Sequence, residues 1–231
     1  MKKIFVLFTA LLTMAPVFAQ SDDGEDEIEW ETKSNTFFLG PKVGGVLTTM
    51  GDPDGIKLYD GAGVGFSAGV AMKARFGKAS AESEGGTGYF GVGLELKYKL
   101  NAVKTFGTDQ DGKENANLSL SYFEVPIYVQ CYPFATSSSM SNFYAEVGAS
   151  IAGTMSSSPD VLVANGVSIK TGDLKGYDVR PIVGLGYTIP KTGFDINARY
   201  YIGTSDLAKN FKCKMSSFEV SLAWLFDIAQ F

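Results

Sequence analysis

A strict two-residue alternation runs from Tyr89 to Leu100, YFGVGLELKYKL, and it limits the possible fold more than any other feature of the sequence. Each even position holds an apolar or aromatic side chain, whereas each odd position from Gly91 onward holds glycine or a charged residue. A helix would scatter the two sets around its axis, but a β-strand places them on opposite faces. The stretch is as long as a tilted strand that crosses a bilayer, which takes about 9–11 residues. We therefore predict a strand with one face toward hydrocarbon or a core and the other toward water or ion pairs.

Seven further stretches repeat this alternation, and no helical window follows the N-terminal apolar run. The predicted strands cover 37–48, 61–76, 89–100, 118–132, 142–154, 176–189, 193–203 and 216–226. Pro126 lies on the polar face of the fourth strand, where we expect a bulge or kink because proline is poor in a central strand. An even number of antiparallel strands can close on itself. The predicted fold class is all-β, an eight-stranded antiparallel up-and-down transmembrane β-barrel with both termini periplasmic.

The links between these strands support a barrel in an outer membrane. The first, third, fifth and seventh links are on average longer than the second, fourth and sixth. Outer-membrane barrels have long outside loops and short periplasmic turns, so the longer links are the outside ones. The link over 107–112 resembles a Ca²⁺ loop only loosely, because it lacks the alternation and terminal Glu of an EF-hand, and we predict a turn there.

The N-terminus has the pattern of a secretory leader. Two lysines at positions 2 and 3 precede an apolar run from Ile4 to Leu12, and the small residue Ala19 precedes Gln20. A membrane anchor is the alternative, but the apolar run is too short to span a bilayer. We predict a cleaved signal peptide over 1–19, an acidic disordered arm over 20–35 and a β-barrel over 36–231. Such an arm is usually solvated, and weak binding of basic partners or divalent ions is its alternative role.

Charge and composition argue against several functions. The net charge is −5, and loss of Lys2 and Lys3 with the leader makes it −7, which argues against a nucleic-acid partner. The sequence has no histidine, the commonest general base and transition-metal ligand, so we predict neither an enzyme nor a cofactor or metal. A membrane-embedded protease or lipase is the disfavoured alternative. Cys131 and Cys213 lie too far apart in this topology to bond, and we expect Cys213 to be an exposed thiol in an outside loop.

Alternation alone leaves open which face points outward, because a soluble barrel would bury the apolar set. No charge interrupts that set, and one Lys or Arg at mid-bilayer would cost about 2–4 kcal/mol. Glycine crowds the charged face, which suits the inside of a narrow barrel. The leader would carry the chain past the inner membrane without anchoring it. Aromatic residues near strand ends fit interfacial girdles. These are Tyr89, Tyr98, Tyr132, Tyr177, Tyr187 and Trp224.

The polar face supplies the candidate site residues, seven cationic and six acidic, for a lumen filled by side chains. They are Lys42, Lys73, Arg75, Lys97, Lys99, Arg180 and Arg199, with Glu95, Glu124, Glu146, Asp178, Asp195 and Glu219. Unpaired charges would be costly in so narrow a space, and this balance suits a closed ion-pair network. We predict a charge-paired interior and a structural, adhesive or envelope-stabilising role. A narrow channel for small solutes or ions is the alternative, and a soluble secreted ligand-binding β-barrel is a further one.

Three motifs resemble one known family. The stretch Leu120–Val129, LSYFEVPIYV, is similar to the "YLEIPL" strand of the compact outer-membrane β-barrel family labelled PorT-like or "porin family". PIVGLGY at Pro181–Tyr187 resembles its glycine-rich sixth strand, and DINARYYIG at Asp195–Gly203 resembles its "RY-x-x-G" seventh strand.

The resemblance implies an eight-stranded barrel in the outer membrane, in contact with its lipid and inserted by periplasmic chaperones and the barrel-assembly machinery. It implies no common substrate, and the sequence names no partner for the outside loops. Barrels of this family end on an aromatic residue. Phe226 fits the alternation of the last strand, whereas Phe231 is out of phase.

Overall fold

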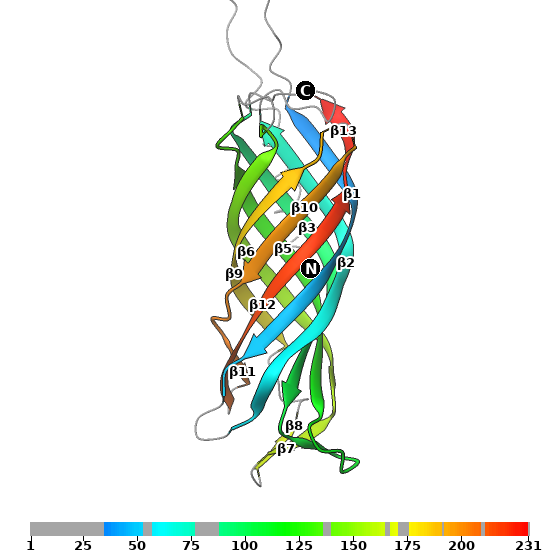
Figure 1. Ribbon diagram of the computed structural model, residues 1–231, viewed down its shortest axis with the longest axis vertical. Helices are drawn as coiled ribbons and strands as arrows, with labels where there is room; N and C mark the ends of the chain where they lie inside the picture. The colour runs from blue at the N-terminus through cyan, green and yellow to red at the C-terminus, as the bar shows by residue number, and fades with distance from the viewer. Residues whose placement is uncertain are drawn as a thin grey trace, which may run out of the picture. The chain divides into compact units, whose positions relative to one another are not determined.

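Eight long strands form one closed antiparallel barrel. The computed structural model describes residues 35–52, 57–76, 88–135, 140–164, 167–170, 176–190, 192–208 and 211–230. The barrel strands are β1 (Thr36–Met50), β2 (Tyr59–Phe76), β3 (Phe90–Thr105), β5 (Asn117–Cys131), β6 (Phe143–Ser158), β9 (Tyr177–Thr188), β10 (Phe194–Tyr201) and β12 (Phe211–Trp224). Each pairs with the next along the chain, and β12 pairs with β1 to close the cylinder (Figure 1). The predicted eight-stranded antiparallel barrel is confirmed. The predicted leader and most of the acidic arm lie outside the described residues.

Five shorter strands lie where the sequence predicted links or an uninterrupted last strand. They are β4 (Thr108–Asp109), β7 (Val161–Ala164), β8 (Val167–Lys170), β11 (Asp206–Ala208) and β13 (Phe226–Gln230). Strands β4, β7 and β8 form a separate sheet, β11 pairs with β12, and β13 continues the last strand beside β1. Two predicted strands were too short, because β3 runs past residue 100 to Thr105 and β12 begins at Phe211 rather than at 216, whereas β9 and β10 are slightly shorter than predicted. None of the described residues forms a helix able to cross a membrane.

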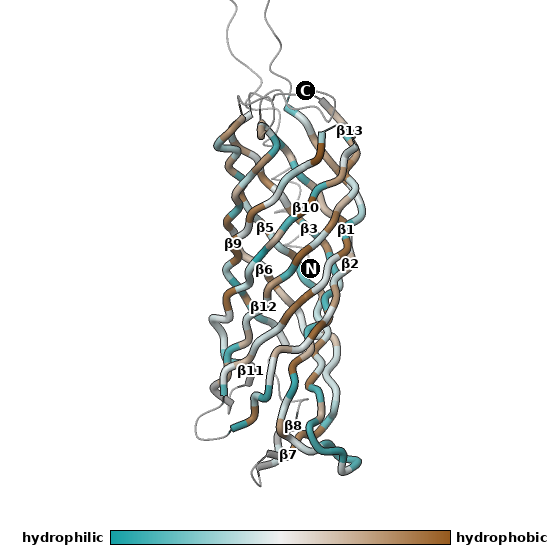
Figure 2. The backbone as a smooth tube through the Cα atoms, viewed as in Figure 1, coloured by the Kyte–Doolittle hydropathy of each residue, from teal (hydrophilic) through white to brown (hydrophobic). Residues whose placement is uncertain are grey.

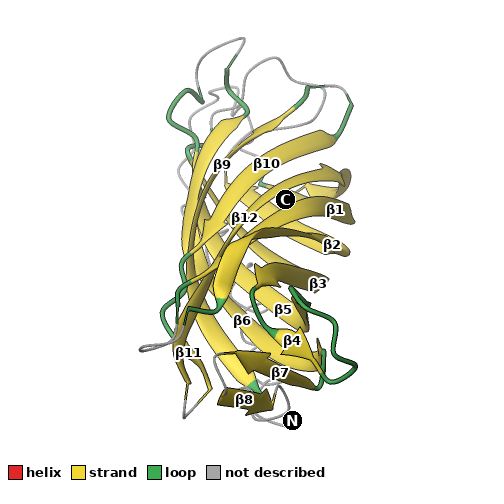
Figure 3. Ribbon diagram, turned by 60° about the horizontal axis from the view of Figure 1, so that its bottom comes forward, coloured by secondary structure: helices red, strands yellow, loops and turns green. Residues whose placement is uncertain are grey.

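The links divide between the two ends of the barrel. The links after β1, β3, β6 and β10 lie at one end, which we call the loop end and which also carries β4, β7 and β8 (Figure 3). The links after β2, β5 and β9 lie at the other end, which we call the turn end, together with strand β13 (Figure 1). The two sets of links are therefore separated as the sequence predicts for an up-and-down barrel.

The outer face of the barrel is a continuous band of apolar side chains. Hydrophilic and hydrophobic residues alternate along the strands that face the viewer in Figure 2, and large apolar side chains are exposed on all eight barrel strands. On β3 the outward residues from Phe90 to Ala102 carry no charge, and Lys104 is the first outward charge beyond them. At about 3.3 Å per residue and a tilt of about 40°, that stretch rises about 30 Å, the thickness of a bilayer's hydrocarbon core. The apolar set points outward, contrary to the soluble alternative.

Aromatic side chains gather on this outer face near the turn end. The ring of Trp224 lies 5.9 Å from that of Phe194 and 4.8 Å from that of Phe226, measured between centroids. Phe226 therefore stands in phase with the outward residues of β12, while Phe231 lies outside the described residues. Two residues of the predicted girdles were placed wrongly, because Tyr132 is only 4% exposed and lies inside the barrel, and Tyr98 points outward near the middle of the charge-free stretch of β3.

The bulge predicted at Pro126 is also wrong. Pro126 pairs in register with Ser150 of β6, and the β3–β5 ladder keeps the same register on both sides of the proline. That ladder lacks pairs at positions 125 and 126 of β5, as expected beside a residue without a backbone N–H. The irregularity of β5 lies instead between Ser121 and Tyr122, where its register with β6 shifts.

Candidate functional site: the charged interior and its apolar mouth

The polar side chains of all eight barrel strands converge on the interior because strand alternation sends every second residue inward. The structure places all thirteen predicted site residues there. Twelve of them have at most 5% of their surface exposed, and the side chain of Asp178 is 14% exposed. Among the described residues, ion pairs within 4.0 Å join twelve of the thirteen, every one except Arg75. We call these twelve residues the ion-pair network.

Glu95 and Arg199 form the centre of the ion-pair network. Two guanidinium nitrogens of Arg199, Nη1 and Nη2, each donate to one carboxylate oxygen of Glu95 at 3.0 Å. Lys42 reaches Glu95 Oε1 at 2.8 Å, and Arg199 Nε reaches Glu146 Oε1 at 2.6 Å. Such bidentate, charge-assisted bonds hold both partners in fixed orientations. Four buried charges thus satisfy one another in the middle of the lumen.

Lysines on β3 extend the network toward the loop end. Lys97 Nζ lies 2.8 Å from both carboxylate oxygens of Glu219 and 3.7 Å from Glu95. Lys99 Nζ lies 3.5 Å from Glu219 and 3.7 Å from Glu124. Each charge therefore faces more than one opposite charge, which reduces the penalty of removing it from water.

Strand β9 supplies the last two members of the network on the loop-end side of the centre. Arg180 Nε lies 2.6 Å from Asp178, and its Nη1 lies 3.4 Å from Glu124. The guanidinium also stacks over the ring of Tyr122, at 4.7 Å from the ring centroid. Because Asp178 is the most exposed member, the network meets solvent on this side.

A third group lies toward the turn end. Lys73 Nζ lies 2.8 Å from Asp195 Oδ2 and donates to the Tyr144 hydroxyl at 3.0 Å. That hydroxyl donates to Asp195 Oδ1 at 2.9 Å, and Thr188 donates to Oδ2 at 2.7 Å. The amide of Asn197 then donates to Glu146 at 3.1 Å and links this group to the centre. The network is continuous along the interior.

Arg75, the seventh cation, stands apart from the network. Its nitrogens donate to the carbonyl oxygens of Gly88 and Ser141 at 3.0 and 2.9 Å and to the side chain of Asn142 at 2.8 Å. Its guanidinium lies 3.8 Å from the ring centroid of Tyr132. The remaining twelve residues comprise six cations and six carboxylates, so the network itself is electrically balanced. Within the described residues, Arg75 joins the turn-end links rather than the acidic side chains.

Buried tyrosines also belong to the interior, although the predicted site residues include only charged side chains. Tyr128 donates to Glu95 at 3.0 Å, and Tyr201 accepts from Lys97 at 2.5 Å. They share the inward parity of the charged residues, so the alternation places them on the polar face of their strands. Tyr128 lies over Gly93 of the paired strand, where an added Cβ would come within 2.2 Å of the ring. Glycine on the charged face therefore makes room for a large side chain from the neighbouring strand.

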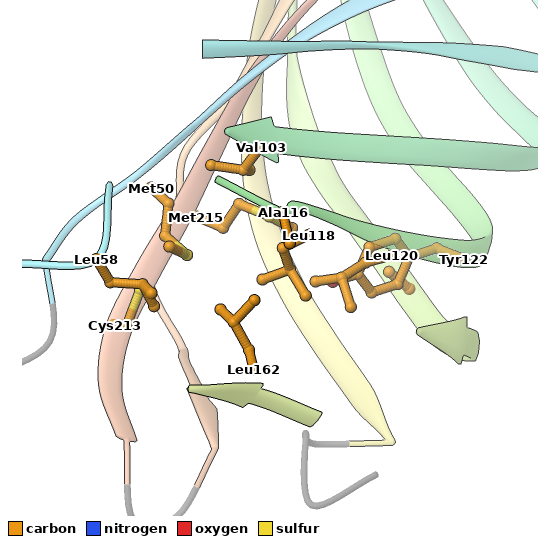
Figure 4. Packing of buried hydrophobic residues seen from close by; sticks show 11 residues of the cluster. Met50, Leu58, Val103, Ala116, Leu118, Leu120, Tyr122, Leu162, Cys213 and Met215 are labelled. Carbon is orange, nitrogen blue, oxygen red and sulfur yellow. The ribbon is translucent and has the colours of Figure 1, made fainter. Parts of the chain in front are cut away.

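The interior becomes apolar at the loop end, which the sequence did not predict. Eleven buried residues pack together there (Figure 4). Ten of them form what we call the apolar seat: Met50, Leu58, Val103, Ala116, Leu118, Leu120, Tyr122, Ala152, Cys213 and Met215. The eleventh, Leu162, comes from β7. Cys213 is 1% exposed and its thiol donates to the Gly51 carbonyl at 2.9 Å, so the predicted exposed thiol is wrong. The reason is that β12 begins before Cys213 and turns its side chain inward.

Two aspartates at the loop end accept hydrogen bonds from backbone N–H groups. Asp52 accepts hydrogen bonds from the N–H groups of Leu58 and Tyr59 at 3.0 and 2.7 Å, which holds Leu58 in the seat. Asp109 accepts from the N–H groups of Asp111 and Lys113 at 3.0 and 2.9 Å, so its carboxylate closes a turn. Among the residues described, no cluster of three His, Cys, Asp or Glu side chains could hold a metal ion.

This arrangement defines a class of protein: a narrow β-barrel with an apolar outer band and a charge-paired interior. The sequence of residues 18–209 matches the family model described as "Outer membrane protein beta-barrel domain". The chain belongs to this family, and it is an outer-membrane β-barrel protein. No curated protein matches it in sequence.

Solved structures of small outer-membrane proteins resemble the fold. Ail, the attachment invasion locus protein of Yersinia pestis, is 15% identical, with 83% of this chain and 99% of Ail covered and a TM-score of 0.46. Neisserial surface protein A is 11% identical, with 82% and 97% covered and a TM-score of 0.41. OprG from Pseudomonas aeruginosa is 12% identical, with 84% and 97% covered and a TM-score of 0.42.

Proposed function

We propose that this protein has a structural, adhesive or envelope-stabilising role in the outer membrane and does not conduct solutes. The observation that carries the proposal is the bidentate pair of Glu95 and Arg199, which crosses the lumen between β3 and β10. The surrounding charges are nearly all buried and paired, which supports a lumen without a continuous water-filled path past this bridge. A closed interior of this kind makes the barrel rigid. Interactions with other molecules would then take place at its loop end.

The orientation that fits this role has both termini in the periplasm and the loop end outside the cell. Two features support it. The loop-end links hold their own secondary structure, β4, β7, β8 and β11, whereas the turn-end link over 189–193 is short. Outer-membrane barrels place elaborate loops outside and short turns in the periplasm. A leader over 1–19, cleaved on export, and an acidic arm over 20–35 on the periplasmic side complete this arrangement.

Within the family, we place the chain in the PorT-like group on the three motifs quoted above. We propose no enzymatic activity and no cofactor. During biogenesis the chain would be carried by periplasmic chaperones and inserted by the barrel-assembly machinery, with outer-membrane lipid as its permanent contact.

Conductance of the purified, folded barrel in planar lipid bilayers tests the proposal. Folding is first verified by heat-modifiable migration on gels, and detergent dependence by purification with and without detergent. We expect no stepwise current from the native protein or from the charge reversals Arg75→Glu and Glu124→Lys. Stepwise currents whose size or ion preference changes with these reversals would establish the narrow channel instead.

A further inference from the structure

The β7–β8 hairpin is bound to the barrel by few backbone contacts. Strand β7 pairs with β4 at two positions only, Thr108 with Val163 and Asp109 with Leu162, and otherwise with β8. Within the described residues, neither strand joins a barrel ladder. Figure 3 shows this small sheet lying across the loop end beside the barrel strands. Since barrel strands share ladders along most of their length and the hairpin does not, the hairpin can separate without breaking a described barrel ladder.

Leu162 is the one fully buried side chain among those described on this hairpin. It is 1% exposed and packs into the apolar seat, where Figure 4 shows it facing Leu118 and Leu120. Gly107 fits closely over it, because an added Cβ there would come within 2.7 Å of the Leu162 side chain. The next residue, Val163, is 39% exposed and points away. Among the described residues, one buried leucine and two ladder pairs therefore attach the hairpin to its surroundings.

The ion-pair network does not depend on the hairpin. Every cation and carboxylate of the network comes from a barrel strand, and none comes from β4, β7 or β8. Departure of Leu162 would expose the apolar seat but would leave the Glu95–Arg199 bridge closed. Opening at this end is thus separable from opening of a pore.

We propose that the β7–β8 hairpin is a lid on the mouth of the barrel and that Leu162 is its latch. The lid opens by local unfolding of the β4–β7 contact while the barrel stays intact, as weakly attached segments of folded proteins do. When it opens, the apolar seat and the Cys213 thiol face solvent.

Cys213 is a built-in reporter of this opening. The Cys131→Ser background leaves Cys213 as the single thiol, and a water-soluble maleimide is applied to the folded protein in lipid vesicles. We expect slow labelling, because the thiol is buried, and a rate roughly tenfold or more higher in Leu162→Ala, since the lost burial favours the open lid. Val163→Ala is the matched control on the same strand, and its exposed side chain predicts an unchanged rate.

A reversible bridge tests the same idea with Leu162 intact. Thr108 and Val163 are direct ladder partners, so Thr108→Cys/Val163→Cys can tie the lid to β4. Labelling of Cys213 alone, read by peptide mass spectrometry, should fall when the bridge is oxidised and recover after reduction. If oxidation leaves the rate unchanged, or if Leu162→Ala folds and labels at the native rate, the hairpin is a fixed part of the barrel end and the lid does not exist.

Discussion

Glu95 of β3 and Arg199 of β10 bind each other across the full width of the barrel. In the closed ring of eight strands, β3 and β10 lie four strands apart in both directions. The two hydrogen bonds between them, both 3.0 Å long, therefore span the diameter of the lumen. Because the pair is bidentate and buried, it fixes the distance between opposite walls.

Loss of Arg199 should strongly destabilise the barrel. Arg199→Ala leaves the Glu95 and Glu146 carboxylates buried with fewer partners, and breaking a buried pair in this way costs about 3–5 kcal/mol. In the double variant Glu95→Ala/Arg199→Ala, the remaining Lys42 and Glu146 retain opposite charges. We expect its loss to be smaller than the sum of the single losses by about 1–3 kcal/mol.

The measurement is the free energy of unfolding in urea, taken from barrels folded into lipid vesicles. Lys104→Ala is the control, because that charge lies on the outer surface of the same strand as Glu95. Strict additivity of the two single variants would mean that the pair contributes no coupling and that the lumen is not braced by it.

Local sequence was enough to predict the strands and their faces. In Tyr89–Leu100, Leu94 and Leu96 alternate with Glu95 and Lys97. The two faces of a strand follow from this alternation alone, so the neighbouring strands need not be known. The inward position of the charged residues follows from the same parity. Which charges meet does not follow, because the contact of Glu95 with Arg199 depends on the closure and register of the whole sheet.

The apolar seat at the loop end could not be predicted for a related reason. Val103 and Leu118 share the inward parity of the charged residues. Val103, however, lies beyond the end of the predicted strand 89–100, and Leu118 is the first residue of the predicted strand 118–132. The membrane band stops near Ala102, and the outward residues beyond it become polar, so the alternation that marks a lipid-facing strand fades. The strands nevertheless continue, and their inner face changes from charged to apolar. Leu162 reaches this core from a link in which no long periodic segment exists.

Substitution of Gly93 should disturb the interior through Tyr128. An added methyl group would lie 2.2 Å from the tyrosine ring, so Gly93→Ala must displace the ring and its hydrogen bond to Glu95. Overpacking of this kind costs about 1–3 kcal/mol. Gly45→Ala is the control, since an added Cβ at that outward glycine meets no atom within 4 Å.

A second comparison separates the clash from any general effect of alanine. In a Tyr128→Ala background, Gly93→Ala should cost much less than it does in the native protein, as judged by urea unfolding in vesicles. An equal cost in both backgrounds would show that the ring is not what restricts position 93.

Arg75 should control the order of the turn end. It donates to the carbonyl oxygens of Gly88 and Ser141, which belong to two different links, and it stacks on Tyr132. Arg75→Ala removes these bonds together, and hydrogen bonds from a charged group contribute about 1.5–3 kcal/mol. We expect faster hydrogen exchange at the Tyr132 amide, which donates to the Tyr89 carbonyl at 2.8 Å.

The Arg75 effect should remain at its own end. The Ala116 amide at the loop end donates to the Gly107 carbonyl, and its exchange should be unchanged in the variant. Arg75→Lys keeps the charge but cannot reproduce the planar, forked donors, so only partial protection is expected. Uniform acceleration at both ends would mean that Arg75 supports the whole barrel rather than the turn end.

A single charge on the outer face should measure the depth of the membrane band. Leu96 and Ala102 both point outward on β3, with Leu96 near the middle of the charge-free stretch and Ala102 at its loop-end edge beside Lys104. Leu96→Arg should lower the free energy of unfolding in lipid vesicles by about 2–4 kcal/mol, and Ala102→Arg by about 0–1 kcal/mol, because the cost of a charge falls toward the interface. Similar costs at both positions would contradict the lipid contact of this face. The two losses in free energy of unfolding can also be compared in bilayers of two thicknesses. A thicker bilayer buries position 102 and raises the loss there toward that at position 96. The comparison therefore locates the edge of the hydrocarbon relative to Ala102.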